Sequence, residues 1–165
     1  MIVVSNTSPL TNLAAIGQFD LLQRLYANLH IAQGVWEELN LGGKRWPGCD
    51  EVAKADWIEQ HSVQNQALVT ALQRDLDRGE AESIALALQL NAGLVLLDEK
   101  EGLHAARRLG LRVIGVVGIL LEAKANGMLD SVHPALDALR QSAGFYPSAP
   151  LYKYALMLAG ENEET

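Results

Sequence analysis

Short, continuous apolar runs alternate along the chain with amphipathic helical segments, and this alternation constrains the fold most. The clearest run is Gly93 to Leu97, and an uninterrupted run of this length is typical of a strand that is covered on both faces. Further strands are predicted at 2–4, 30–32, 57–63 and 112–116. Helices are predicted at 9–16, 19–25, 34–39, 67–76, 80–90, 100–109, 118–125, 131–142 and 150–159. This order predicts an α/β fold with a parallel sheet.

The length and composition of the chain both indicate one domain. The sequence has 165 residues, 49% of them hydrophobic, which suits one ordinary domain with a buried core and excludes a disordered chain. We expect the domain at 1–160 and a disordered acidic tail at 161–165. The glycine-rich stretch 41–56 is predicted to be a mobile loop. Cys49 is the only cysteine, so no disulfide within the chain is possible.

The charge balance limits how the protein could bind a polyanion. Its 13 Lys and Arg residues are outnumbered by 20 Asp and Glu residues, which gives a formal net charge of −7. A globally basic nucleic-acid coat is excluded, whereas a local basic patch is not. The candidate RNA contacts are Lys44, Arg45, Arg107 and Arg108. Without a signal peptide or an apolar run of about 20 residues, we expect a soluble cytoplasmic protein.

Polar residues follow the predicted strands at the edge where α/β proteins bind ligands. Asn6 follows the first strand and Asp98 follows the strand at 94–97, while Glu38 and Glu80 lie on helices nearby in the predicted topology. Converging carboxylates repel one another unless a divalent cation neutralises them, and oxygen ligands favour Mg²⁺ or Mn²⁺. The candidate catalytic and metal-binding residues are Asn6, Glu38, Glu80 and Asp98, supported by Thr7, Ser8 and Glu99.

Several other interpretations compete with this metal site. Taken singly, each acid is also explained as a solvated surface charge or as an acid near a helix N-terminus. The sequence contains no dinucleotide-binding or phosphate-binding glycine motif and no nucleophile elbow. The histidines His30, His61, His104 and His133 lack the spacing of a zinc-binding helix, so no zinc site is indicated.

Four short motifs, in this order and at this spacing, resemble the PIN-domain family. Residues 3–10 are similar to its opening motif, in which an Asp usually stands at the position of Asn6. Residues 35–39 resemble the second motif, with Glu38 as the acid. Residues 79–87 resemble the third, in which the distance to Asp98 favours Glu80 over Glu82. Residues 94–99 resemble the fourth. The segments 112–120 and 123–127 are similar to a prokaryotic, VapC-like toxin branch of the family.

The resemblance implies a single-domain, three-layer α/β/α sandwich with a central parallel sheet. It also implies a Mg²⁺- or Mn²⁺-dependent ribonuclease of toxin–antitoxin type, a homodimer, and an antitoxin protein that covers the active site. Asn6 departs from the family pattern, because an amide keeps a ligand oxygen but removes one negative charge. A catalytically weak or silent PIN-fold module that binds an antitoxin-like protein or RNA is therefore the alternative. A receiver-like or small-molecule-binding α/β domain is a third interpretation.

Overall fold

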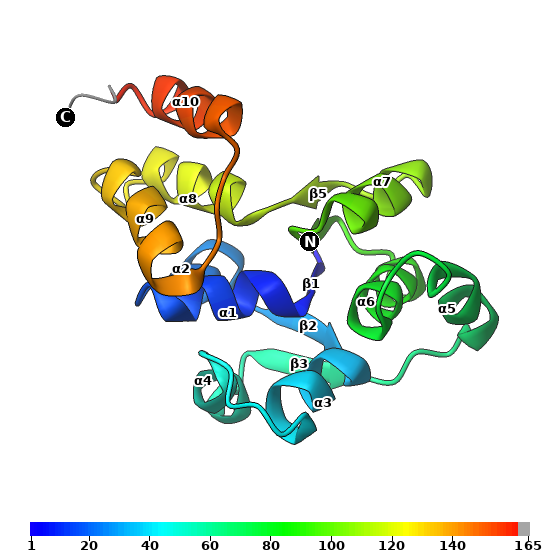
Figure 1. The fold of residues 1–165 in the computed structure, drawn as a ribbon. Helices are drawn as coiled ribbons and strands as arrows, with labels where there is room; N and C mark the ends of the chain where they lie inside the picture. Colours follow the sequence, from blue (N-terminus) through cyan, green and yellow to red (C-terminus); the bar gives the residue numbers. More distant parts are fainter. Residues whose placement is uncertain (162–165) are drawn as a thin grey trace.

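A computed structural model, which describes residues 1–161, contains one sheet of five parallel strands in the order β3-β2-β1-β4-β5 (Figure 1). The strands are β1 (Val3–Ser5), β2 (Leu29–Ala32), β3 (Ile58–His61), β4 (Leu94–Leu96) and β5 (Val113–Ile114). The chain builds outward from β1 to β3 and then returns to place β4 on the other side of β1. The carboxyl ends of β1 and β4 therefore flank the point at which the strand order reverses, where open α/β sheets bind ligands.

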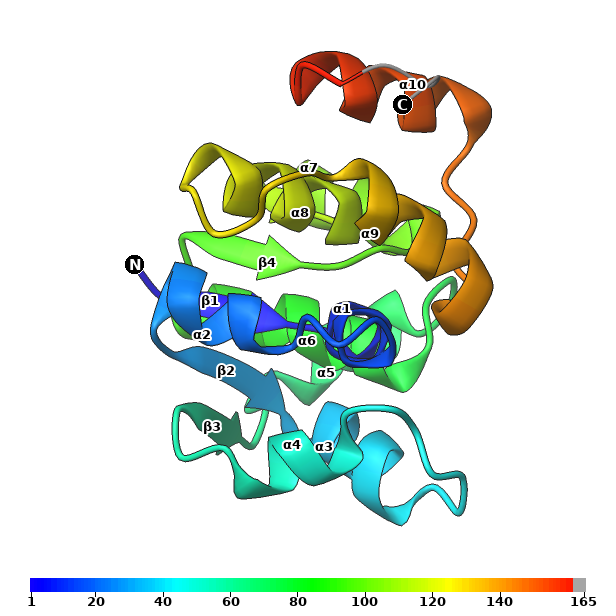
Figure 2. The same cartoon turned by 90° about the vertical axis from the view of Figure 1, so that its left-hand side faces the viewer.

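Helices cover both faces of the sheet, which gives the expected three layers. The α-helices are α1 (Thr7–Ala15), α2 (Asp20–Tyr26), α3 (Gln33–Leu41), α4 (Cys49–Lys54), α5 (Gln66–Leu72), α6 (Arg78–Gln89), α7 (Lys100–Arg108), α8 (Val116–Ala125), α9 (His133–Ala138) and α10 (Ala149–Leu158), and a π-helical turn, η1 (Leu139–Ala143), follows α9. Figure 2 shows α1, α2 and α9 in front of the sheet and α5 and α6 behind it.

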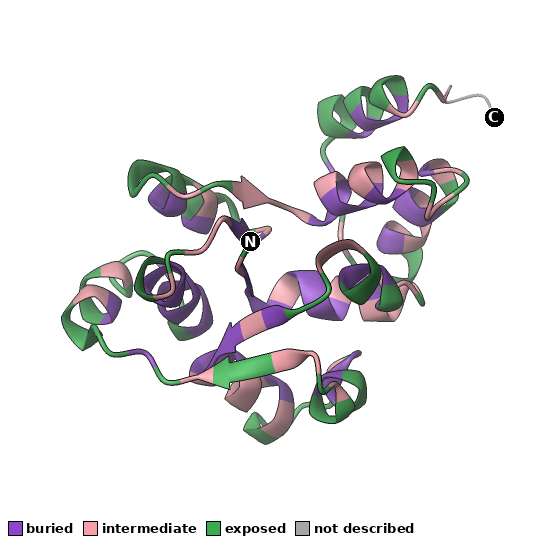
Figure 3. Ribbon diagram, turned by 180° about the vertical axis from the view of Figure 1, so that it is seen from behind, coloured by how far each residue is buried: buried purple, intermediate pink, exposed green. Residues whose placement is uncertain are grey.

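The central strands bury alternate residues in two separate clusters. Val3 and Leu96 belong to the cluster shared with α1, α2, α8 and α9, whereas Val4 and Val95 belong to the cluster shared with α5, α6 and α7. Successive strand residues point to opposite faces, so a strand covered on both faces must be apolar throughout. The predicted α/β fold with its parallel sheet is confirmed. The edge strand β3 has exposed residues, whereas β1, β2 and β4 are almost entirely buried (Figure 3).

Several local predictions differ from the structure. The predicted strand 112–116 is shortened to β5, because α8 begins at Val116 instead of Gly118. The segment 41–56, predicted as a loop, contains α4, because Cys49 and Val52 pack into the larger core cluster. Helix α1 begins at Thr7 instead of Pro9, and Asn6 is its N-cap residue in an extended conformation. The predicted helix 131–142 is divided into α9 and η1. The helix within 41–56 forms because tertiary packing overrides the local glycine signals, and α1 begins before Pro9 because proline is tolerated in the first turn of a helix.

The expected acidic tail begins with a residue that the structure fixes. Glu161 forms an ion pair with Lys124 at 2.8 Å, and it accepts hydrogen bonds from the backbone N–H groups of Val132 and His133. The rest of that tail, residues 162–165, lies outside the described residues. Within residues 1–161, no helix combines the length and the apolar character that crossing a membrane requires.

Candidate functional site

The ends of β1 and β4 lie side by side at the point where the strand order reverses. Ser5 pairs with Leu96, and the Asn6 N–H donates a 2.9 Å hydrogen bond to the Leu96 carbonyl. Asn6 then opens α1, while Asp98 and Glu99 lead from β4 into α7. Two of the predicted acidic motifs therefore start from one edge of the sheet, as expected for parallel strands.

Three side-chain oxygens surround a small space beside Gly79, near the start of α6. A Cβ atom placed on Gly79 would lie 3.2 Å from Glu38 Oε2, 3.3 Å from Asn6 Oδ1 and 3.6 Å from Asp77 Oδ1. These oxygens come from three different elements: α3, the end of β1 and the N-cap of α6. We call Asn6, Glu38 and Asp77 the oxygen cradle. Because Gly79 has no side chain, the space between these oxygens stays open.

The Asn6 side chain is unusual for a buried amide. Asn6 is 3% exposed, and among residues 1–161 its Oδ1 is the one buried side-chain polar atom that lacks a hydrogen-bond partner. Leaving such an acceptor unsatisfied costs about 1–3 kcal/mol. Its neighbour Glu38 is held in place, because Thr7 Oγ1 donates a 2.8 Å hydrogen bond to Glu38 Oε2. An unsatisfied oxygen beside two carboxylates is a suitable set of ligands for a hard cation.

Glu80 extends this acidic group beneath α7. It is 7% exposed, and its Oε2 would lie 3.2 Å from a Cβ atom on Gly102. Burial raises the pKa of Glu80 to about 8, with further contributions from a hydrogen bond to Asp77 and from the charges of Asp77, Glu99 and Glu38. Asp77 also caps α6, since its Oδ1 accepts the Glu80 N–H at 2.8 Å. A bound cation would favour the ionised form of Glu80 instead.

Asp98 lies at the same edge of the sheet, but its carboxylate is engaged elsewhere. Its Oδ1 accepts a 2.7 Å hydrogen bond from the Val116 N–H at the start of α8, and its Oδ2 accepts one from Asn12 Nδ2 at 3.4 Å. Burial raises the pKa of Asp98 to about 6, although the hydrogen bonds from Val116 and Asn12 lower it in part. The structure thus shows Asp98 connecting β4 to α8 and α1, and among the described residues no hydrogen bond joins this carboxylate to the cradle.

The three supporting residues occupy different positions. Thr7 contacts Glu38 directly, as described above. Glu99 is exposed, and its charge raises the pKa values of both Glu80 and Asp98, which places it beside the acidic group. Ser8 is half-buried in the first turn of α1, where its backbone carbonyl accepts a hydrogen bond from Thr11 Oγ1 at 3.1 Å.

Asp77 is the cradle residue that the sequence motifs did not reveal. A capping signal was nevertheless present, because Asp77 stands three residues before Glu80 at the start of an apolar helix.

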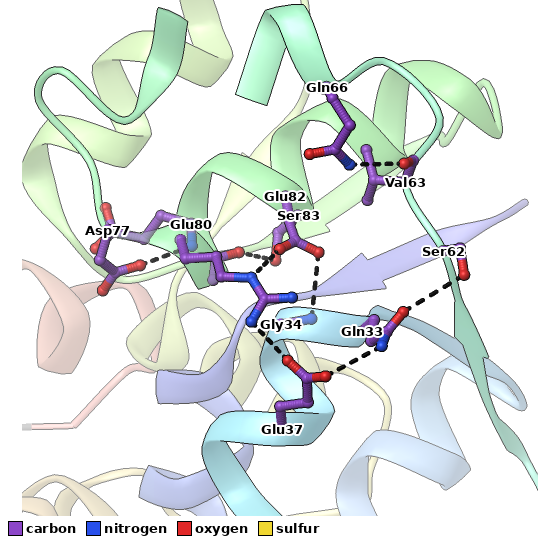
Figure 4. A network of polar contacts seen from close by, with 12 residues as sticks. Gln33, Gly34, Glu37, Ser62, Val63, Gln66, Asp77, Glu80, Glu82 and Ser83 are labelled. Carbon is purple, nitrogen blue, oxygen red and sulfur yellow. Dashed lines mark hydrogen bonds and ion pairs between the residues drawn. The ribbon is translucent and has the colours of Figure 1, made fainter. Parts of the chain in front are cut away.

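Glu82, in contrast, has a structural role (Figure 4). It is 5% exposed, accepts a hydrogen bond from the Gly34 N–H at 3.2 Å and pairs with Arg78 Nε at 2.5 Å. Arg78 Nη1 also lies 2.5 Å from Glu37 Oε2, so the network joins α6 to α3.

A groove of about 510 Å³ lies between α3 and the start of α6 and reaches two cradle residues. It contains the half-exposed Arg78 guanidinium, a cation that could contact a phosphate. Its walls are formed by Gly34, Glu37, Glu38, Leu41, Gly42, Asp77, Arg78 and Gly79.

The predicted RNA contacts lie in two other regions of the surface. Lys44 Nζ is 3.8 Å from the centre of the Trp46 ring, and Arg45 pairs with Asp50, both beside a separate cavity after α3. Arg107 and Arg108 are exposed on α7, where they line a further cavity with Glu101 and His104.

The sequence indicated no zinc site, yet the structure brings two histidines and a glutamate together on β2 and β3. Potential ligand atoms of His30, Glu59 and His61 all lie within 4.8 Å of one another. The pKa of His30 is lowered by burial and by the neighbouring His61 ring, although the Glu59 charge acts in the opposite direction. The sequence signal was the i, i+2 pair Glu59 and His61 on one predicted strand, which a search for helical spacing overlooks.

Two comparisons with known proteins complete the description. A search of curated proteins returned no significant match. A family model described as a PIN domain matches residues 2–161, which include all five strands, the cradle, Glu80 and Asp98. Because this match covers nearly the whole sequence, the chain belongs to the PIN-domain family.

Proposed function

We propose that the protein is a divalent-metal-dependent endoribonuclease of toxin–antitoxin type, and that the oxygen cradle and Glu80 form its hydrolytic site. The observation that carries this proposal is the unsatisfied Asn6 Oδ1, which faces the same space as oxygens of Glu38 and Asp77. Membership of the PIN-domain family supports a nuclease-type function. The all-oxygen donor set supports Mg²⁺ or Mn²⁺ as the cation.

Each residue of the site has a distinct role in this proposal. Asn6, Glu38 and Asp77 hold the cation, while Thr7 orients Glu38 through its hydrogen bond. When bound, Mg²⁺ or Mn²⁺ supplies a Lewis acid for the phosphodiester and lowers the pKa of a water molecule. Glu80, whose carboxylate a bound cation would keep ionised, would accept a proton during hydrolysis.

Asp77 supplies to the site the carboxylate that Asp98 was expected to provide. The set predicted from the motifs contained three carboxylates, in Glu38, Glu80 and Asp98. With Asp98 bound to the start of α8, the cradle and Glu80 still contain three, because Asp77 takes its place. In this proposal Asp98 acts as a positioning residue through its hydrogen bonds with Val116 and Asn12.

The groove between α3 and α6 is the proposed path for the RNA strand. Arg78 contacts a phosphate there, and its ion pairs with Glu37 and Glu82 fix the guanidinium in advance. Lys44, Arg45, Arg107 and Arg108 are proposed as outer contacts with the RNA backbone. Because the whole chain is acidic, binding should weaken strongly as the salt concentration rises.

An exposed apolar face on α10 supports the proposed protein partners. Leu151, Tyr154, Met157 and Leu158 are 39–64% exposed along this one helix. A contiguous apolar patch of this kind is characteristic of an interface. A second copy of the chain or the proposed antitoxin would cover it, in a cytoplasmic complex.

Cleavage of a labelled single-stranded RNA, with and without Mn²⁺, tests the proposed activity. We expect cleavage that depends on the cation and that falls at least about 100-fold in the Glu38→Gln variant. The Glu51→Gln variant is the matched control, since Glu51 is an exposed acid on α4. Cleavage that persists in excess EDTA would contradict the proposal.

The silent binding module remains the second candidate, and the neutral Asn6 side chain is the observation that favours it. An amide cannot act as a base and adds no charge to the site. If the native protein is silent, Asn6→Asp should produce a large gain in cleavage. If it is active, the same change should alter the preference between Mg²⁺ and Mn²⁺ more than the maximal rate.

A further inference from the structure

The β3 edge of the sheet carries three potential metal ligands on one face. In the register of β2 and β3, His30 lies opposite Glu59, and His61 lies two residues beyond Glu59 on the same strand. Opposite residues project from the same face, and so do residues two apart. The two strands therefore direct His30, Glu59 and His61 to a common point.

The distances between these side chains are close to those of a metal site. His30 Nδ1 is 2.9 Å from His61 Nε2, and the Glu59 carboxylate oxygens lie 3.7 Å from His30 Nδ1 and 3.8 Å from His61 Nε2. Two ligands of a tetrahedral zinc ion, each about 2.1 Å from the metal, are about 3.4 Å apart. Small side-chain movements would therefore bring the three ligand atoms to coordinating distance.

We propose that His30, Glu59 and His61 bind one zinc ion or a similar late first-row divalent cation. Two imidazole nitrogens and one carboxylate form a donor set that suits zinc, whereas the oxygen cradle suits a harder cation. The histidine side chains are only 17% and 19% exposed, while Glu59 is 67% exposed. The ion is thus shielded on the histidine side and open to solvent at its fourth position.

The ion would fasten the exposed edge strand to the rest of the sheet. Residues 59 and 60 of β3 are exposed, and β3 has a hydrogen-bonded neighbour, β2, on one side only within the described part of the chain. Two of the ligands belong to β3 and one to β2, so coordination crosses the strand boundary. This site shares no residue with the cradle, and it stands whether or not the protein cleaves RNA.

Calorimetric titration of Zn²⁺ into the full-length, EDTA-treated protein tests this site. The titration is made in a Glu38→Gln and Glu80→Gln background, which removes two of the three carboxylates of the proposed hydrolytic site. We expect one ion per chain and at least a tenfold loss of affinity in both Glu59→Gln and His61→Gln. His104→Gln is the matched control, because His104 is exposed on α7. Excess Mg²⁺ should not compete.

A second readout separates specific coordination from weak surface binding. Co²⁺ should give the strong visible absorption of a tetrahedral site in the parent protein and lose it in His61→Gln. Circular dichroism checks the fold, and Glu59→Gln decides the result if the histidine variant fails to fold, since Glu59 is exposed. Zinc binding unchanged in both variants, or absent from the parent at 100 micromolar zinc, overturns the proposal.

Discussion

Two buried glutamates on α6, Glu80 and Glu82, are separated by a single residue and have opposite surroundings. Glu82 faces α3, where the Arg78 guanidinium and the Gly34 N–H neutralise and solvate its carboxylate. Glu80 faces the cradle and α7, where the neighbouring charges are those of Asp77, Glu99 and Glu38. Both residues are less than a tenth exposed, so burial alone does not distinguish them. The two residues differ because Glu82 pairs with a cation, the Arg78 guanidinium, whereas Glu80 has acidic neighbours.

This difference separates a structural acid from a functional one. A buried carboxylate with its own arginine is stable in its ionised form and connects two helices. A buried carboxylate among other acids keeps a proton unless a cation arrives, which is the property expected of a metal or proton-transfer site. The PIN-domain motifs place both acids in one short segment, where the distance to Asp98 favoured Glu80, and the partners of the two acids give the physical reason.

The largest expected effect comes from filling the cradle. Gly79→Ala would place a methyl group 3.2 Å from Glu38 Oε2 and 3.3 Å from Asn6 Oδ1. Gly79 lies in α6 without a positive φ, so alanine gains about 0.5–1 kcal/mol of helix propensity, which the tight contacts of its methyl group with Glu38 and Asn6 oppose. We expect Mn²⁺ affinity and RNA cleavage to fall by about 100-fold. Calorimetry, a cleavage assay and urea denaturation measure the three quantities, and unchanged Mn²⁺ affinity would remove the cradle from the proposal.

The next largest effect is on stability, and it tests the surroundings of Glu82, whose charge Arg78 compensates. Arg78→Ala leaves the Glu82 carboxylate buried with the Gly34 N–H as its remaining described donor. Because Arg78 is itself half-exposed, we expect a loss of about 1–3 kcal/mol in the free energy of unfolding, below the cost of breaking a fully buried pair. Urea denaturation measures it, and Arg74→Ala, at an exposed arginine just before α6, is the control. The double variant with Glu82→Gln should recover part of the loss.

The pH dependence of stability tests the surroundings of Glu80, whose neighbouring charges are acidic. The pKa of Glu80 rises from 4.5 in the unfolded chain to about 8 in the folded protein, so the folded state binds the proton more tightly. Stability should therefore fall as the pH rises from about 4.5 to 8, on the order of 2 kcal/mol. Glu80→Gln should remove most of this fall and be the more stable protein at pH 8. Thermal unfolding from pH 4.5 to 8 measures the difference, and a parallel pH profile in both proteins would contradict the assignment.

The sequence predicted the fold more completely than the site for a physical reason. Runs such as Gly93 to Leu97 record burial on two faces, and that burial is a property of the chain itself. The family motifs indicated Asn6, Glu38 and Glu80 at one edge of the sheet. The role of Asp77 depends on the turn before α6, and the contacts of Asp98 depend on where α8 begins, so neither follows from a motif. The grouping of His30 with Glu59 depends on the register between two strands.

The smallest effect should come from Asp98, although its motif is as clear as that of Glu80. In Asp98→Asn the new amide oxygen could still accept the Val116 N–H, since that hydrogen bond needs an acceptor and not a charge. We expect this variant to change Mn²⁺ affinity and cleavage by less than about tenfold, whereas Glu80→Gln should change cleavage by more. Asp98→Ala, which also loses the hydrogen bonds to Val116 and Asn12, should lower the free energy of unfolding by about 1–3 kcal/mol. If Asp98→Asn instead abolishes Mn²⁺ binding, then Asp98 ligates the cation itself, and its hydrogen bonds with Val116 and Asn12 do not mark it as a structural acid.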